Sequence, residues 1–292
     1  MAKSSLFRFS NGSVERLFEL PDDTTSVVYS PSSSCWFSSR KSGGKIYKID
    51  QSGTAEEWLD DPKLEDMFGF CGSRDFLFVA TKDGYILRCD PQNGEMNHLI
   101  GRKAATSIFS KRRMSLSEHG NILSYDQKRD FLFIVFPKFR CIGVVDGASS
   151  FSIEFGSGAK EFSIGSSSEK CGFVDPVSVA ATDNGMALVC DGGSHSIWVF
   201  KLGNGKSHKL LGVYGTPMRA GQADGELKVA SFSSPQLLLE NGNVVFLADN
   251  NGKTIREIDM EKMSVKTICD MPSQAICLAT DSENNPCWVG SE

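Results

Sequence analysis

Short apolar runs, many of them alternating with polar residues, recur along the whole chain and are separated by turns rich in Gly, Asn, Asp and Ser. The clearest two are 186–191 and 244–249, and each follows directly on a turn that contains Asn-Gly. Runs of this length predict β-strands, and Asn-Gly between two such runs predicts a tight hairpin. The pattern therefore predicts an all-β chain.

The second half of the chain contains two copies of one unit. Each copy has Phe-x-x-Pro before an apolar run, then a tight turn, a run that ends in Asp, a loop with Gly or Asn, and two further runs. Pro176 and Pro235 are 59 residues apart, and Asp191 and Asp249 are 58 apart. Internal similarity at such a period is typical of repeat architectures, and each copy reads as a four-stranded antiparallel sheet.

Weaker copies of the unit occupy the first half of the chain. Three whole units are predicted at 27–58, 67–100 and 122–155, and two unpaired strands at 275–280 and 286–290. The strands that this last unit lacks are predicted at 5–9 and 14–18, on either side of Asn11-Gly12. Pairing the two ends of the chain would complete a sixth sheet and leave no open inner edge.

The prediction from these units is an all-β, six-bladed β-propeller closed by pairing of the N-terminal strands with the C-terminal blade. Residues 1–292 are expected to form one domain, with blade 6 split between 5–20 and 274–292. Composition agrees, because 40% apolar and 23% charged residues with a net charge of −5 exclude a disordered chain. Phe is abundant, at 20 residues, which favours many short buried strands.

The same sequence gives expectations about location and cofactors. The longest uninterrupted apolar stretch, 131–136, is far shorter than a membrane-spanning helix, and Arg8 interrupts the amino terminus where a secretory signal would be apolar. The nine cysteines include no Cys-x-x-Cys pair, so reduced thiols in a cytoplasmic protein are expected. No cofactor and no membrane attachment are expected.

The segment 173–269 resembles NHL repeats, which have a Pro-led first strand, a Gly turn and a second strand that ends in Val-x-Asp before a loop leading to Arg-Ile-like residues. Val189-Cys-Asp191 and Leu247-Ala-Asp249 carry this pattern, as do Gly221-Gln-Ala-Asp-Gly225 and Ile255-Arg256. The pattern is degenerate over the first 160 residues. The kelch repeat is a rival, because Gly192-Gly193 follows a strand, but a Gly pair in nearly every blade is missing. The resemblance implies a propeller, a fold that hosts enzymes, protein binders and nucleic-acid binders alike, so the function has to be argued from residues.

An enzyme is the alternative. Six-bladed lactonases hold a divalent metal with oxygen ligands at the mouth of the central channel, and candidates here are Asp126, Asp183, Glu240 and Asp281, each expected to end an innermost strand. Most of them lead into turns where Asp also serves local hydrogen bonding, so metal catalysis is the weaker hypothesis. The four histidines do not recur at one blade position, which argues against a zinc lyase.

The recurring Asp191 and Asp249 are interpreted as structural: a carboxylate at the end of a strand before a Gly/Asn loop accepts backbone N–H groups and fixes that loop. Two loops between blades offer surfaces for recognition instead. The first carries five cations, Arg102, Lys103, Lys111, Arg112 and Arg113. It would suit a protein or, less well in an acidic chain, single-stranded RNA.

Ser115 follows the Arg pair and is a candidate phosphorylation site for a basophilic kinase. The second loop, 203–234, carries Tyr214, Met218 and Arg219, residue types common at protein interfaces. The function predicted from the sequence is a monomeric, non-catalytic platform that binds another protein through these loops.

Overall fold

The computed structural model describes residues 4–40, 43–65, 67–81, 85–100, 122–147, 150–165, 167–203 and 208–291. These residues form two compact units. The amino-terminal unit comprises residues 1–121 together with 275–292, and the central unit comprises residues 122–274. Helical structure in the described residues is confined to the single turns η1 (Pro62–Leu64), η3 (Pro137–Phe139) and η4 (Ser168–Lys170). The prediction of an all-β chain is confirmed.

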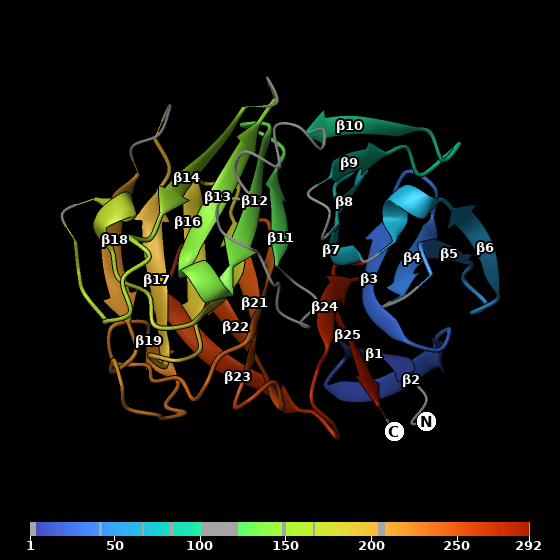
Figure 1. Ribbon diagram of the computed structural model, residues 1–292. Helices are drawn as coiled ribbons and strands as arrows, with labels where there is room; N and C mark the ends of the chain where they lie inside the picture. Colours follow the sequence, from blue (N-terminus) through green and yellow to red (C-terminus); the bar gives the residue numbers. More distant parts are fainter. Residues whose placement is uncertain are drawn as a thin grey trace. The chain divides into compact units, whose positions relative to one another are not determined.

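The amino-terminal unit contains three four-stranded antiparallel sheets (Figure 1). Blade 1 consists of β3 (Thr24–Ser30), β4 (Cys35–Arg40), β5 (Lys45–Ile49) and β6 (Ala55–Asp60). Blade 2 consists of β7 (Met67–Gly72), β8 (Leu77–Thr81), β9 (Ile86–Cys89) and β10 (Met96–Ile100). Blade 6 has the strand order β2-β1-β25-β24 and joins β1 (Ser4–Ser10) and β2 (Ser13–Glu19) to β24 (Cys277–Thr280) and β25 (Pro286–Ser291).

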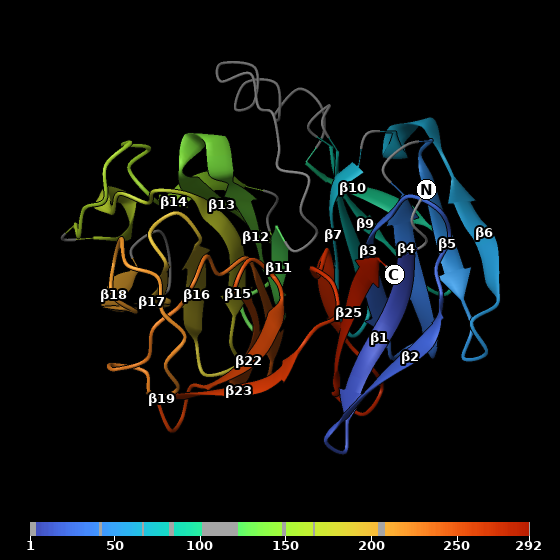
Figure 2. The ribbon, with the colours of Figure 1, turned by 90° about the horizontal axis from the view of Figure 1, so that it is seen from below.

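Blade 6 pairs the two ends of the chain, as the sequence predicted. In Figure 2, β1 lies beside β25, and the two strands run antiparallel with Leu6 opposite Val289 and Phe7 opposite Trp288. The rings of Phe7 and Trp288 stack with centroids 5.8 Å apart. Leu6 is fully buried, in a cluster that includes Trp36 of blade 1. The amino-terminal strand is therefore part of the core of its unit.

The central unit contains the other three sheets. Blade 3 consists of β11 (Leu123–Asp126), β12 (Phe131–Phe136), β13 (Cys141–Asp146) and β14 (Phe151–Phe155). Blade 4 consists of β15 (Pro176–Ala181), β16 (Met186–Asp191), β17 (Ser196–Lys201) and β18 (Lys209–Tyr214). Blade 5 consists of β20 (Leu237–Asn241), β21 (Val244–Asp249), β22 (Thr254–Asp259) and β23 (Ser264–Asp270), with β19 (Gly225–Glu226) as a fifth strand on the outer edge of β23.

A hydrogen bond that recurs between blades holds successive first strands together. The Ser178 hydroxyl of β15 accepts the amide of Leu238 in β20 at 3.0 Å, and the Ser124 hydroxyl of β11 accepts the amide of Ala181 in β15 at 3.3 Å. In the amino-terminal unit the thiol of Cys277 plays the same part between blades 6 and 1. A small polar side chain at this position satisfies an amide that would otherwise be buried without a partner.

The six sheets confirm the predicted fold class, a six-bladed β-propeller. All 24 predicted strands are found, and the short β19 is the strand that the repeat pattern missed. The expectation of one undivided domain stays a prediction. Among the described residues, no helix is long and apolar enough to cross a membrane. None of the nine cysteines, all of which lie in the described residues, forms a disulfide bond, and six of them are buried.

Candidate functional site

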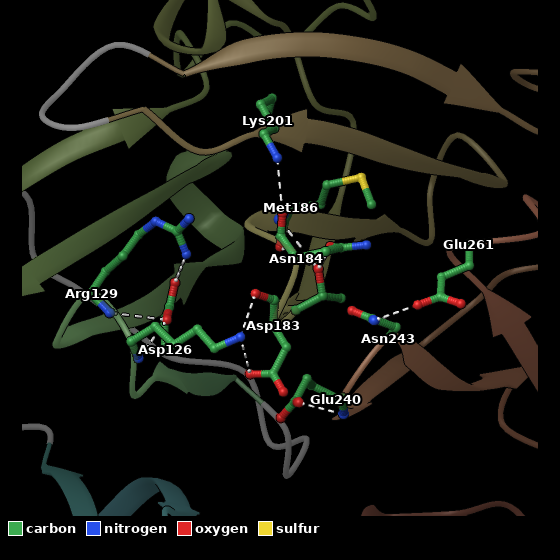
Figure 3. Close-up of polar contacts among 12 residues, drawn as sticks. Asp126, Arg129, Asp183, Asn184, Met186, Lys201, Glu240, Asn243 and Glu261 are labelled. Atoms are coloured by element: carbon green, nitrogen blue, oxygen red, sulfur yellow. Dashed lines mark hydrogen bonds and ion pairs between the residues drawn. The ribbon is translucent and has the colours of Figure 1, made fainter.

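Three carboxylates gather at one end of the central unit, where β11, β15 and β20 lie side by side (Figure 3). They are Asp126, Asp183 and Glu240, three of the four predicted metal ligands. The expectation that each ends a strand needs a correction for Asp183, because β15 ends at Ala181 and Asp183 belongs to the following turn. Glu240 is one residue from the end of β20.

Asp126 is fully engaged by its own turn. One carboxylate oxygen accepts the amides of Lys128 and Arg129 at 3.0 and 3.2 Å, and the other pairs with the Arg129 guanidinium at 2.8 Å. Its side chain is 4% exposed. These contacts give Asp126 a structural role, since a carboxylate that accepts two turn amides fixes the hairpin between β11 and β12.

Asp183 and Glu240 differ in their exposure. The Asp183 side chain is 57% exposed, 3.6 Å from the Lys128 ammonium. Glu240 is half-buried, and its carboxylate accepts the amide of Gly242 at 2.6 Å. Burial, together with the negative charges of Asp183 and Asp126, raises the pKa of Glu240 to about 7 against the opposing effects of the Gly242 amide and of Lys128. Glu240 can therefore exchange a proton near neutral pH.

The raised pKa gives an expected result for Glu240→Gln. An unfolded Glu ionises near pH 4.5, so between there and pH 7 the folded protein holds a proton that the unfolded chain has lost, and wild-type stability falls as the pH rises. Gln does not titrate and keeps the acceptor for Gly242. The free energy of unfolding of the variant, relative to that of wild type, should therefore be about 1–3 kcal/mol higher at pH 8.5 than at pH 4.5.

Urea unfolding at both pH values measures this gain. Asp183→Asn removes a neighbouring negative charge, so in that background the pH-dependent difference should shrink. A Glu240→Gln effect of the same size at both pH values would contradict the assignment.

Asp281, the fourth predicted ligand, lies in the amino-terminal unit, and the expectation that it ends a strand also needs a correction, because β24 ends at Thr280. It accepts the amides of Glu283 and Asn285, both at 2.9 Å, and pairs with Arg8 at 3.0 Å. Burial alone would raise its pKa, but the bonds from Asn285, Arg8 and Glu283 lower it overall. Within the described part of the chain, no three His, Cys, Asp or Glu side chains form a group that could hold a metal ion.

The recurring Asp191 and Asp249 accept backbone amides, as predicted, but most of these amides belong to the residues just before the Pro of each repeat and not to the loop that follows the strand, from which Ser194 donates to Asp191 at 3.4 Å. Asp191 accepts from Val174 at 2.9 Å and from Asp175 at 2.7 Å. Asp249 accepts from Ser233 at 2.8 Å. Both carboxylates are fully buried. They hold the start of the first strand against the end of the second.

Arg256 is a buried structural side chain whose contacts the sequence analysis did not predict. Its guanidinium is 1% exposed and binds Asp249 at 2.9 Å and Asp224 at 2.8 Å. It also donates to the carbonyls of Ser231 at 2.6 Å and Ala223 at 2.7 Å, and lies over a Phe ring. The planar fork of Arg suits such multiple contacts. The Ile-Arg of the repeat pattern was the signal for it, but apart from Asp249, seven positions away, its hydrogen-bond partners come from residues 25 to 33 positions away.

Residues 215–234, called the insertion loop from here on, are held in place by hydrogen bonds to Arg256. Its strand β19 pairs with β23, and the Asp224 carboxylate accepts the amide of Thr267 at 2.7 Å. Leu227 and Phe232 are fully buried in the core shared by blades 4 and 5. The loop is therefore an ordered extension of blade 5, held from beneath by a buried cation.

The outer surface of the insertion loop carries exposed apolar side chains. Met218 is 63% exposed and Val229 is 67% exposed, and Arg219 is exposed beside Met218. Met218 has a φ of 65°, in the left-handed region, and its amide donates to the carbonyl of Ser194 at 2.9 Å. Tyr214, the other predicted interface residue, lies in β18 and is half-buried against the core.

The remaining residues considered in the sequence analysis are two histidines with contacts inside the fold and the residues of the basic loop. His208 is buried and paired with Glu154 at 2.5 Å, and the ring of His195 accepts a backbone amide. Neither histidine belongs to a metal-binding group in the described residues. The basic loop lies outside the described residues, so its predicted roles stay predictions. It comprises Arg102, Lys103, Lys111, Arg112, Arg113 and the candidate phosphorylation site Ser115.

Comparison with known proteins gives one curated relative at low coverage and many similar structures. No family model matches the chain. It is 35% identical over 102 residues, 35% of its length, to NHL repeat-containing protein 2 of Gallus gallus, and spans 13% of that protein. This chain therefore corresponds to a small part of the relative.

Solved structures resemble the chain over nearly its whole length. A putative gluconolactonase has a TM-score of 0.61 at 12% identity, with 99% of this chain and 92% of the other covered. A chain of the nidogen/laminin complex has a TM-score of 0.58 at 10% identity, with 98% of each covered. Virginiamycin B lyase from Staphylococcus aureus has a TM-score of 0.55 at 11% identity, with 97% and 86% covered. The shared feature is the β-propeller. At these identities the likeness shows the fold alone.

Proposed function

We propose that this chain is an NHL-like, non-catalytic platform in the cytoplasm that binds another protein through its insertion loop. The repeat pattern around Asp249 and Arg256 and the likeness to an NHL repeat-containing protein support the family. The engagement of Asp126 and Asp281 by their own turns favours a platform over a metal enzyme. The nidogen/laminin complex is an example of a similar structure that takes part in a protein complex.

The backbone of Met218 carries the proposal. A long apolar side chain in the left-handed region is unfavourable, since Gly or Asn fits there with less strain. At 63% exposure the Met218 side chain contributes little to packing in return. Strained residues with exposed side chains are typical of binding sites, and Met is suited to irregular apolar surfaces. Arg256 holds the insertion loop in one conformation before a partner binds, which lowers the entropy cost of binding.

Met218→Gly separates binding from stability. Gly accepts a φ of 65° without strain, so the free energy of unfolding should stay within about 1 kcal/mol of wild type. Loss of an apolar anchor at the centre of an interface should weaken partner binding at least tenfold. The measurement is affinity capture with quantitative mass spectrometry, followed by a titration of each recovered protein against purified wild type and variant.

Met263→Gly is the matched control, because Met263 also has a left-handed φ, 52°, but lies half-buried in the turn between β22 and β23. It should keep full binding. Equal recovery of every captured protein by wild type and Met218→Gly would refute the proposed surface. A stoichiometric divalent ion in the purified protein, with a Tm lowered by chelator, would favour the metal-assisted hydrolase or lyase instead.

A further inference from the structure

The turn between β16 and β17 accepts hydrogen bonds from the insertion loop near both of its ends. The Ser194 carbonyl accepts the amide of Met218 at 2.9 Å. The next residue, His195, accepts the amide of Ser234 on ring nitrogen Nδ1 at 2.8 Å. Blade 4 thus holds the loop near its first exposed apolar residue and at its last residue, through two adjacent residues of one turn.

The role of His195 follows from a difference between the two repeats. In blade 4, Asp191 accepts both amides before the Pro. In blade 5, Asp249 accepts the equivalent of the first, from Ser233, and uses its other oxygen to bind Arg256. The second amide, from Ser234, therefore needs another acceptor, which His195 supplies from the neighbouring blade.

An imidazole nitrogen accepts a hydrogen bond only while it carries no proton. The Ser234 contact therefore fixes the neutral tautomer of His195, with the hydrogen on Nε2. A second proton would go to Nδ1 and place two N–H donors against each other. Histidine is the side chain that most readily changes charge between about pH 5 and pH 8, and His195 is half-buried rather than sealed from solvent.

The charged residues on the elements around His195 are either bonded to other residues or exposed to solvent. Asp191 and Asp249 are buried and bonded to the amides described above, and Arg256 is bound by Asp249 and Asp224. Asp175, before β15, and Arg219, in the insertion loop, are exposed. The surroundings thus hold charges of both signs.

We propose that His195 is a proton-linked switch of the insertion loop. Proton uptake at Nδ1 removes the acceptor for Ser234, loosens the loop at its last residue and weakens partner binding in mildly acidic solution. The effect on binding rests on the proposed function, whereas the effect on the loop does not. Loss of one backbone hydrogen bond should lower the protection of the Ser234 amide about threefold to tenfold.

Amide exchange by NMR, corrected for the intrinsic pH dependence of exchange, tests the switch without any partner. Wild-type Ser234 should lose protection threefold to tenfold between about pH 8 and pH 5.5 as histidine ¹⁵N signals report protonation of His195. His195→Asn is the matched control, because the Asn carbonyl oxygen takes the place of Nδ1, does not titrate and tolerates the left-handed φ of 55° at this residue.

His195→Asn should therefore keep Ser234 protected at both pH values, and His195→Ala should leave it poorly protected at both. A pH-independent wild type, or a His195→Asn variant that responds like wild type, would overturn the switch. The partner is any captured protein whose binding Met218→Gly weakens. The affinity of wild type for this partner should fall in the same pH range, whereas the affinity of His195→Asn should stay constant. If the protection of the Ser234 amide changes with pH while the partner affinity does not, only the regulatory role is overturned. The proposed function itself is tested separately by Met218→Gly.

Discussion

Arg256→Met is expected to lower the free energy of unfolding by about 3–5 kcal/mol, because it leaves Asp249 charged, fully buried and without its counter-ion. Two loop carbonyls, of Ser231 and Ala223, lose their donors at the same time. Met fills a similar volume, so the change measures the loss of charge and hydrogen bonds rather than a cavity. Chemical unfolding at pH 7.5 provides the measurement.

The pH dependence of the Arg256→Met defect distinguishes an unpaired charge from lost packing. Burial raises the pKa of Asp249 even though Ser233, Asn250 and Arg256 lower it, and the variant removes the last of these. A raised pKa means that stability is lost as the pH rises, so the deficit should be smaller at pH 4 than at pH 7.5.

Arg256→Met/Asp249→Asn, which neutralises the orphaned carboxylate, should recover part of the loss at pH 7.5. A deficit that is equal at both pH values and unaffected by Asp249→Asn would contradict the role of the ion pair.

Leu6→Ala is expected to destabilise the protein by about 2–5 kcal/mol, although Leu6 is only five residues from the amino terminus. Residues so near a chain end are usually frayed, but Leu6 is fully buried between the last strand and blade 1. The loss combines the transfer of the side chain to water with the cavity left behind. Thermal and urea unfolding of wild type and variant give the value.

Val14→Ala is the control in the same hairpin, since Val14 is 40% exposed on β2. It should change stability by less than about 0.5 kcal/mol. If Leu6→Ala were as mild as Val14→Ala, the amino-terminal strand would not be part of the core.

Local patterning was enough to place the strands and blades of this protein. A period of two, turn dipeptides and the spacing of Asp191 and Asp249 gave the blades, including the pairing of the two chain ends. The structural role of the two recurring Asp residues was also predictable, because strand-end carboxylates before Gly or Asn turns serve backbone amides wherever they occur. Asp126 and Asp281 also accept amides of their own turns, although the turn after Asp126 contains neither Gly nor Asn.

The candidate site was predictable only in part. Met218 and Arg219 were recognised by residue type, but exposure and the left-handed backbone of Met218 could not be read from the chain. Tyr214 was selected by the same criterion and lies half-buried in a strand. Residue type indicates what a side chain can do, while its orientation depends on the strand register that surrounds it.

The sequence by itself determined the all-β class, the six blades and their boundaries, since these depend on hydrophobic period and turn chemistry within a few residues. The tertiary structure alone decided how Arg256, Asp224 and Asp249 meet beneath the insertion loop, and that His195 of one blade completes the amide bonding of the next. Those contacts join residues 7 to 39 positions apart, and no local propensity records which distant partner a buried polar group will find.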